Sequence, residues 1–137
     1  MKKVFKKFAK VALVFTFVFA CAATAYAYNT KFSFDLTSGI FSPWKYSSAA
    51  YKYSADENPV VECTYVEPSD ATFTYDVVNS EEESRVVAFS ATGTFATREF
   101  ERNTTVKNKK YRLAVKRDSG AWNSSATTQG TWNIDSY

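Results

Sequence analysis

Eight cationic side chains are concentrated between residues 98 and 117, a segment that contains only two acidic residues. Three of them, Lys110, Arg112 and Lys116, alternate with apolar residues, so a β-strand would place all three on one face. Such a face attracts anionic partners, for example wall polymers, membrane surfaces or acidic proteins. The candidate cations are Arg98, Arg102, Lys107, Lys109, Lys110, Arg112, Lys116 and Arg117. The alternative is that this strand pairs with acidic strands or only prevents edge-to-edge aggregation.

Aromatic residues form a second candidate group. Trp44 and Tyr46 would share one strand face, and Tyr51 and Tyr53 would share another. Exposed rings on a β-sheet protein can stack on sugars, which suggests a glycan-binding surface. The alternative is that these residues complete a core and place amphipathic tyrosines at its rim. Trp122, in a polar stretch near the C-terminus, is the aromatic residue expected to lie most fully in solvent.

The sequence contains no histidine. This absence excludes Ser–His and Cys–His nucleophilic catalysis and nearly all zinc and copper sites. A carboxylate-pair hydrolase remains possible, with Asp35, Glu62, Asp76 and Asp135 as candidates. Because Asp35 and Asp76 occupy predicted outward positions, solvated carboxylates are the simpler interpretation. We therefore predict a non-enzymatic protein with no cofactor and no metal.

Residues 1–27 have the three-part pattern of a secretory signal peptide. Five lysines precede an apolar run of ten residues, and a small-residue stretch ending in Ala25 and Ala27 forms a cleavage site. The pattern predicts a helical signal peptide and a secreted protein. Two alternatives remain, an uncleaved membrane anchor and a surface lipoprotein attached through Cys21.

Cleavage after Ala27 would leave residues 28–137 as a single domain. Twelve basic and fourteen acidic residues would remain, so the net charge would be −2 instead of the +3 of the full chain. A mildly acidic domain gives no support for nucleic-acid binding. Cys63 would be the single cysteine, which excludes an internal disulfide. Its apolar neighbours predict a small buried hydrophobic residue rather than a reactive thiol.

The chain after residue 27 shows the period-two alternation of β-strands, interrupted by turn residues. We predict seven or eight short strands in an antiparallel β-sandwich, with a small closed β-barrel as the second choice. The expected inward faces are Phe32, Phe34 and Leu36; Val61, Cys63 and Tyr65; Phe73, Tyr75 and Val77; Val87, Phe89 and Ala91; Tyr111, Leu113 and Val115; and Trp132 and Ile134. Residues 123–129 are predicted to form a long loop or a weakly patterned strand.

The expected last strand carries Gly130, Trp132 and Asp135 in the order Gly-x-Trp-x-x-Asp. With the leader and a β domain of about 100 to 110 residues, this motif resembles small exported bacterial proteins of unknown function. The resemblance implies no known activity. Some proteins of this kind resemble bacteriocins or accompany their export genes.

Three functions follow from these observations. We expect a secreted or surface-associated, non-enzymatic β-sandwich that binds a cell-envelope polymer or a protein partner. The first alternative is a bacteriocin-like or toxin-like protein that acts on the envelope of a neighbouring cell. The second alternative is a secreted inhibitor that presents the polar segment 103–109 to a hydrolase.

Overall fold

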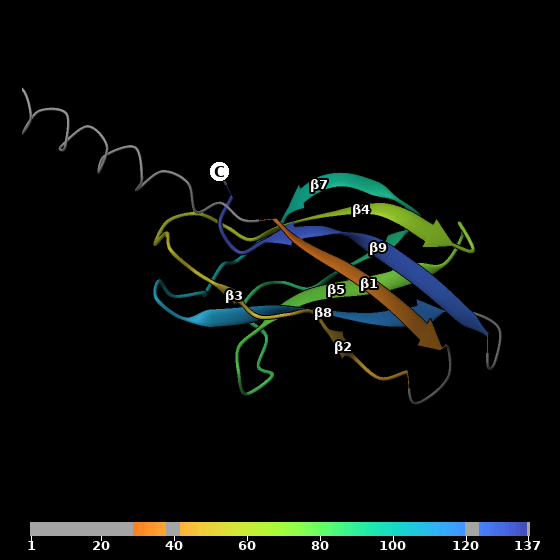
Figure 1. The fold of residues 1–137 in the computed structure, drawn as a ribbon, viewed down its shortest axis with the longest axis horizontal. Helices are drawn as coiled ribbons and strands as arrows, with labels where there is room; N and C mark the ends of the chain where they lie inside the picture. Colours follow the sequence, from red (N-terminus) through yellow and green to blue (C-terminus); the bar gives the residue numbers. More distant parts are fainter. Residues whose placement is uncertain (1–28, 38–41, 120–123, 137) are drawn as a thin grey trace, which may run out of the picture.

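The computed structural model describes residues 29–37, 42–119 and 124–136, and every regular element in these residues is a β-strand (Figure 1). The described residues contain no helix long and apolar enough to cross a membrane. The nine strands are β1 (Thr30–Thr37), β2 (Lys45–Tyr46), β3 (Ala50–Tyr51), β4 (Val60–Glu67), β5 (Thr72–Val78), β6 (Phe89–Thr92), β7 (Phe95–Glu99), β8 (Lys110–Ser119) and β9 (Ser125–Asn133). The predicted all-β class is confirmed. The predicted signal-peptide helix lies outside the described residues.

The strands form two antiparallel sheets that lie across one another (Figure 1). The first sheet has the order β1-β9-β4-β7, and the second has the order β2-β8-β5-β6 with β3 also paired to β8. β1 pairs with β9 along its whole length, from Thr30 opposite Trp132 to Thr37 opposite Ser125. The strand order therefore brings the two ends of the described chain together in one sheet.

The core lies between the two sheets and is rich in aromatic rings. Tyr75 of β5 is at its centre, with ring centroids 6.3 Å from Phe32, 5.6 Å from Phe89 and 5.2 Å from Phe95. The Tyr75 hydroxyl shares a hydrogen bond of 2.9 Å with the Thr128 hydroxyl of the opposite sheet. Burial of each large side chain stabilises the fold by about 1.5–3 kcal/mol. Aromatic packing across both sheets therefore holds the second sheet in place beneath the first.

One predicted strand face is wrong because β4 contains a β-bulge. Val61 and Cys63 are buried as expected, but Tyr65 is 46% exposed and Val66 is buried in its place. The pairing of β4 with β9 shifts between Cys63 and Tyr65. One extra residue in a strand reverses the side-chain alternation beyond it, which moves Tyr65 to the outer face.

One further sequence prediction is wrong, and for another the strand alternative is confirmed. Val87 precedes β6 and is exposed, in contrast to its predicted place on an inward face with Phe89. Residues 125–129, predicted as a loop or a weak strand, belong to β9, which pairs on both sides. Their pattern was weak because Thr128 is a polar residue in the core, where Tyr75 provides its hydrogen-bond partner.

At Gly130 the backbone of β9 lies close against that of β4. A Cβ atom at this position would lie 1.9 Å from the Glu62 carbonyl oxygen and 2.9 Å from the Phe32 ring. No side chain fits there, so the first residue of the Gly-x-Trp-x-x-Asp motif is explained by the close contact between the two backbones.

Candidate functional site

The short strands β2 and β3 place aromatic residues beside the cationic strand β8. Tyr46 pairs with Ala114 of β8, and Tyr51 pairs with Lys110. Along β8 the apolar residues point into the core, so Arg112 and Lys116 point outward. We call the surface formed by Trp44, Tyr46, Tyr51, Lys110, Arg112 and Lys116 the β2–β3–β8 face.

Two cations of this face lie over aromatic rings. The Lys116 Nζ is 5.0 Å from the centre of the Trp44 ring, and the Arg112 guanidinium carbon is 4.6 Å from the centre of the Tyr46 ring. Such cation–π contacts are worth about 0.5–1 kcal/mol at exposed sites. They favour side-chain orientations in which the positive charges lie beside flat apolar surfaces.

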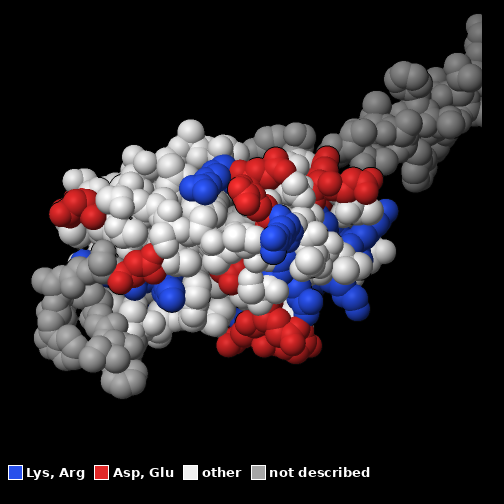
Figure 2. Space-filling view, turned by 180° about the vertical axis from the view of Figure 1, so that it is seen from behind, with Lys and Arg blue, Asp and Glu red and all other residues white. Residues whose placement is uncertain are grey.

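Acidic side chains border the β2–β3–β8 face. Glu82 Oε1 lies 3.7 Å from the Arg112 guanidinium. Burial raises the pKa of the Tyr46 hydroxyl, and a hydrogen bond with the Glu82 carboxylate raises it further. Tyr46 therefore stays neutral at physiological pH, and Arg112 is shared between a ring and a carboxylate. Figure 2 likewise shows basic and acidic groups side by side on the surface.

Asp76 is buried, although its strand position predicted a solvated carboxylate. It lies on β5 opposite Ala114, and its Oδ1 accepts hydrogen bonds from the Val77 backbone N–H at 2.7 Å and the Ser84 hydroxyl at 2.8 Å. Burial raises the pKa of the Asp76 carboxyl above its usual value, and these two hydrogen bonds oppose the shift. The sequence prediction failed because Ser84, in the loop after β5, folds back onto Val78 and covers this position.

Not all predicted cations belong to the same surface. Lys107 and Lys109 are exposed in the loop that leads into β8, near Lys110. Arg98 lies on β7 in the other sheet, where its guanidinium carbon is 3.9 Å from the Phe89 ring centre. Arg102 is exposed beyond the end of β7. The predicted group of eight cations is therefore divided between two sheets.

The prediction that Arg117 belongs to a cationic surface is wrong. It follows the inward register of β8, is buried, and donates a hydrogen bond of 2.6 Å from Nη1 to the Ser124 carbonyl. Its charge is not available to a partner at the surface.

The predicted residues Trp122, Ala25, Ala27 and Cys21 lie outside the described residues.

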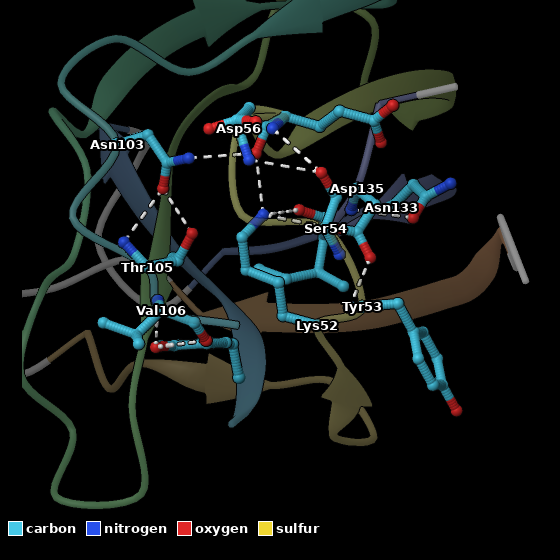
Figure 3. Close-up of polar contacts among 12 residues, drawn as sticks. Lys52, Tyr53, Ser54, Asp56, Asn103, Thr105, Val106, Asn133 and Asp135 are labelled. Atoms are coloured by element: carbon cyan, nitrogen blue, oxygen red, sulfur yellow. Dashed lines mark hydrogen bonds and ion pairs between the residues drawn. The ribbon is translucent and has the colours of Figure 1, made fainter. Parts of the chain in front are cut away.

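Sequence reasoning missed a buried ion pair between Lys52 and Asp135 (Figure 3). Lys52 is fully buried, and its Nζ donates to Asp135 Oδ1 at 3.0 Å, to the Glu57 carbonyl at 2.7 Å and to the Ile134 carbonyl at 3.1 Å. The Asp135 carboxylate also accepts the backbone N–H groups of Tyr53 and Ser54. This pair ties the segment after β3 to the end of β9 and so fixes the positions of Tyr51 and Tyr53.

Two of the remaining predicted carboxylates have hydrogen-bond partners among the described residues. Asp135 is held by Lys52, and Asp35 is exposed on β1, where it accepts a hydrogen bond from Thr127. No three His, Cys, Asp or Glu side chains of the described residues are grouped to hold a metal ion. Cys63 is buried as predicted, with its Sγ 3.3 Å from the Thr128 hydroxyl.

Comparison with protein-family models, with curated proteins and with solved structures finds no match to this chain. The function is therefore inferred from the geometry of the β2–β3–β8 face.

Proposed function

We propose that the protein is an exported, non-enzymatic β-sandwich that binds an anionic polymer of the cell envelope through the β2–β3–β8 face. The observation that carries this proposal is the pair of cation–π contacts, Lys116 over Trp44 and Arg112 over Tyr46. Rings beside fixed positive charges match a ligand that alternates apolar sugar faces with anionic groups. The bacterial leader pattern of residues 1–27 supports an envelope location.

The test is co-sedimentation of the protein with isolated Gram-positive-type cell envelope. The charge-reversal variant Lys110→Glu, Arg112→Glu, Lys116→Glu is expected to lose most of its binding. The matched control changes three exposed cations of the other sheet and its border, Lys31→Glu, Arg98→Glu and Arg102→Glu, which alters the net charge equally. The control is expected to bind as the wild type does. Equal loss in both variants would show that net charge alone governs binding, and no loss in either would contradict the proposal.

The loop 103–109 supports a second candidate function, inhibition of a hydrolase. The Asn103 Oδ1 accepts the Thr105 N–H at 2.9 Å, and the Val106 N–H donates to the Tyr111 hydroxyl at 2.7 Å (Figure 3). These bonds hold the loop while Val106 remains 59% exposed and Lys107 follows it. A rigid, exposed loop lowers the entropic cost of binding to an enzyme cleft.

Stoichiometric inhibition of trypsin by the wild type, lost in Lys107→Ala, would favour this second function. The bacteriocin-like alternative predicts dye leakage from vesicles of anionic phospholipid. Envelope binding without inhibition or leakage would favour the proposed polymer-binding function.

A further inference from the structure

A hollow of about 330 Å³ lies beside the β2–β3–β8 face, between the start of β1 and strand β3. Its volume is at the small end of the range of about 300–1,000 Å³ typical of ligand sites. The lining includes Ala49, Ala50, Tyr51, Tyr53, Asn133 and Ile134, and none of its residues is charged. The hollow therefore suits a small uncharged group.

Asn133 provides an unused hydrogen-bond donor in the wall of this hollow. The residue is 2% exposed, and its Oδ1 accepts the Asp135 N–H at 3.0 Å, which fixes the orientation of the amide. Its buried Nδ2 has no acceptor within hydrogen-bond distance among the described residues. A buried donor without a partner costs about 1–3 kcal/mol. A ligand that brings a carbonyl oxygen to Nδ2 would recover this free energy.

Two tyrosine rings form the outer rim of the hollow. The Tyr51 and Tyr53 ring centroids are 4.7 Å apart at an interplanar angle of 55°, and the residues are 37% and 46% exposed. The Tyr51 hydroxyl donates to the Asn108 Oδ1 at 3.3 Å. The Lys52–Asp135 ion pair fixes the backbone between the rings. The two rings are inclined to each other, and either one alone offers a flat apolar face against which a sugar ring can stack.

From these observations we propose that the hollow binds an N-acetylated sugar unit of the polymer. The acetamido carbonyl accepts from Asn133 Nδ2, its methyl group packs on Ala50 and Ile134, and the sugar ring stacks on Tyr51 or Tyr53. Because Nδ2 has almost no exposed surface in the structure, binding requires a local rearrangement of the hollow's wall that uncovers this atom. The inference rests on the proposed function, since Lys110, paired with Tyr51, connects the hollow to the cations that would contact anionic units.

The test compares two neutral tetrasaccharides of the same linkage, chitotetraose, which carries acetamido groups, and cellotetraose, which has hydroxyls in their place. Calorimetry on the wild type is expected to show cellotetraose binding at least about tenfold more weakly, the factor expected for loss of one hydrogen bond to a buried donor. In amide-region NMR, chitotetraose is expected to shift the side-chain NH₂ signal of Asn133. Equal affinities, or an unmoved Asn133 signal, would overturn the inference.

The variants Tyr51→Ala and Tyr53→Ala are expected to weaken chitotetraose binding by roughly tenfold. Tyr65→Ala is the matched control, because Tyr65 is equally exposed on the other sheet. An equal effect of Tyr53→Ala and Tyr65→Ala would contradict the proposed site. The charge-reversal variant of Lys110, Arg112 and Lys116 is expected to keep chitotetraose binding. A wild type that binds chitotetraose but not the envelope would contradict the proposed polymer-binding function alone. A wild type that binds the envelope but not chitotetraose would contradict the proposed sugar site alone.

Discussion

Lys52 and Asp135 show how one buried contact can position a whole surface. All three donor positions of the Lys52 ammonium have acceptors, and the Asp135 carboxylate accepts two backbone N–H groups besides. Such full pairing offsets the cost of removing two charges from water. The segment that carries Tyr51 and Tyr53 is held in place as a result.

Lys52→Met is expected to lower the free energy of unfolding by about 3–5 kcal/mol, because it leaves a buried carboxylate without its cation. Urea denaturation measures this change. Lys31→Met, at an exposed position on β1, is the control and is expected to change stability by less than about 0.5 kcal/mol. If the two variants were equally stable, the ion pair would have no part in holding the fold.

Asp76 predicts a pH dependence. Burial raises the pKa of its carboxyl in the folded state above the unfolded value of about 3.9. The folded protein therefore binds this proton more tightly than the unfolded chain, and the contribution of Asp76 to stability falls as the pH rises through the folded pKa. Asp76→Asn keeps an oxygen that accepts from Val77 and Ser84 but carries no charge.

Asp76→Asn is thus expected to raise the melting temperature at pH 7 and to lose this advantage below about pH 4. Thermal unfolding of both proteins, followed by circular dichroism between about pH 4 and pH 7, measures these melting temperatures. Asp35→Asn, at an exposed position, serves as the control. A variant less stable than the wild type at pH 7 would show that the charged carboxylate of Asp76 is stabilising.

At the scale of the elements, Gly130 sets the distance between β9 and β4. Gly130→Ala is expected to destabilise the protein by about 3 kcal/mol or more, because the added Cβ would overlap the Glu62 backbone. Thr131→Ala, the next residue of β9, is expected to cost less than about 1 kcal/mol. Urea denaturation of both variants checks the contrast, and similar stabilities would show that the two strands can separate without cost.

Strand alternation predicted β8 and β5, because apolar side chains that face the core recur at every second residue of both strands. It failed at Tyr65, since a β-bulge depends on the partner strand β9, which is distant in sequence. It also failed for Thr128, whose place in the core depends on Tyr75. Local pattern thus predicts a strand, whereas its register and its polar exceptions depend on tertiary pairing.

The candidate site was predictable as two separate groups of residues. Their meeting depends on the pairing of β2 and β3 with β8, which no local pattern reveals. The burial of Lys52 and Arg117 could have been predicted from strand alternation. Lys52 alternates with two outward tyrosines, and Arg117 continues the inward register of Val115.

At the scale of the whole molecule, the predicted leader of residues 1–27 would direct the protein to export. The proposed cleavage after Ala27 predicts that the exported protein begins at Tyr28 and carries no lipid. Intact-mass spectrometry of the protein from its native envelope checks this prediction. A mass that corresponds to a lipid-modified Cys21 at the N-terminus would contradict release and support a surface lipoprotein.

The charge distribution of the whole molecule determines how it meets an anionic polymer. The segment 98–117 carries a net charge of +6, whereas residues 28–137 as a whole carry −2. The proposed binding must therefore be local, because the net charge of residues 28–137 would repel an anionic polymer. Under this proposal the exposed cations of the β2–β3–β8 face, Lys110, Arg112 and Lys116, provide the local attraction.

The most direct test of this claim is the affinity for polygalacturonate measured over a series of salt concentrations. Wild-type affinity is expected to fall steeply as the salt concentration rises, because exposed cations would contact the charges of the polymer. The Lys110→Glu, Arg112→Glu, Lys116→Glu variant is predicted to bind at least about tenfold more weakly at low salt, with a shallower salt dependence. The same affinity and the same salt dependence in both proteins would contradict it.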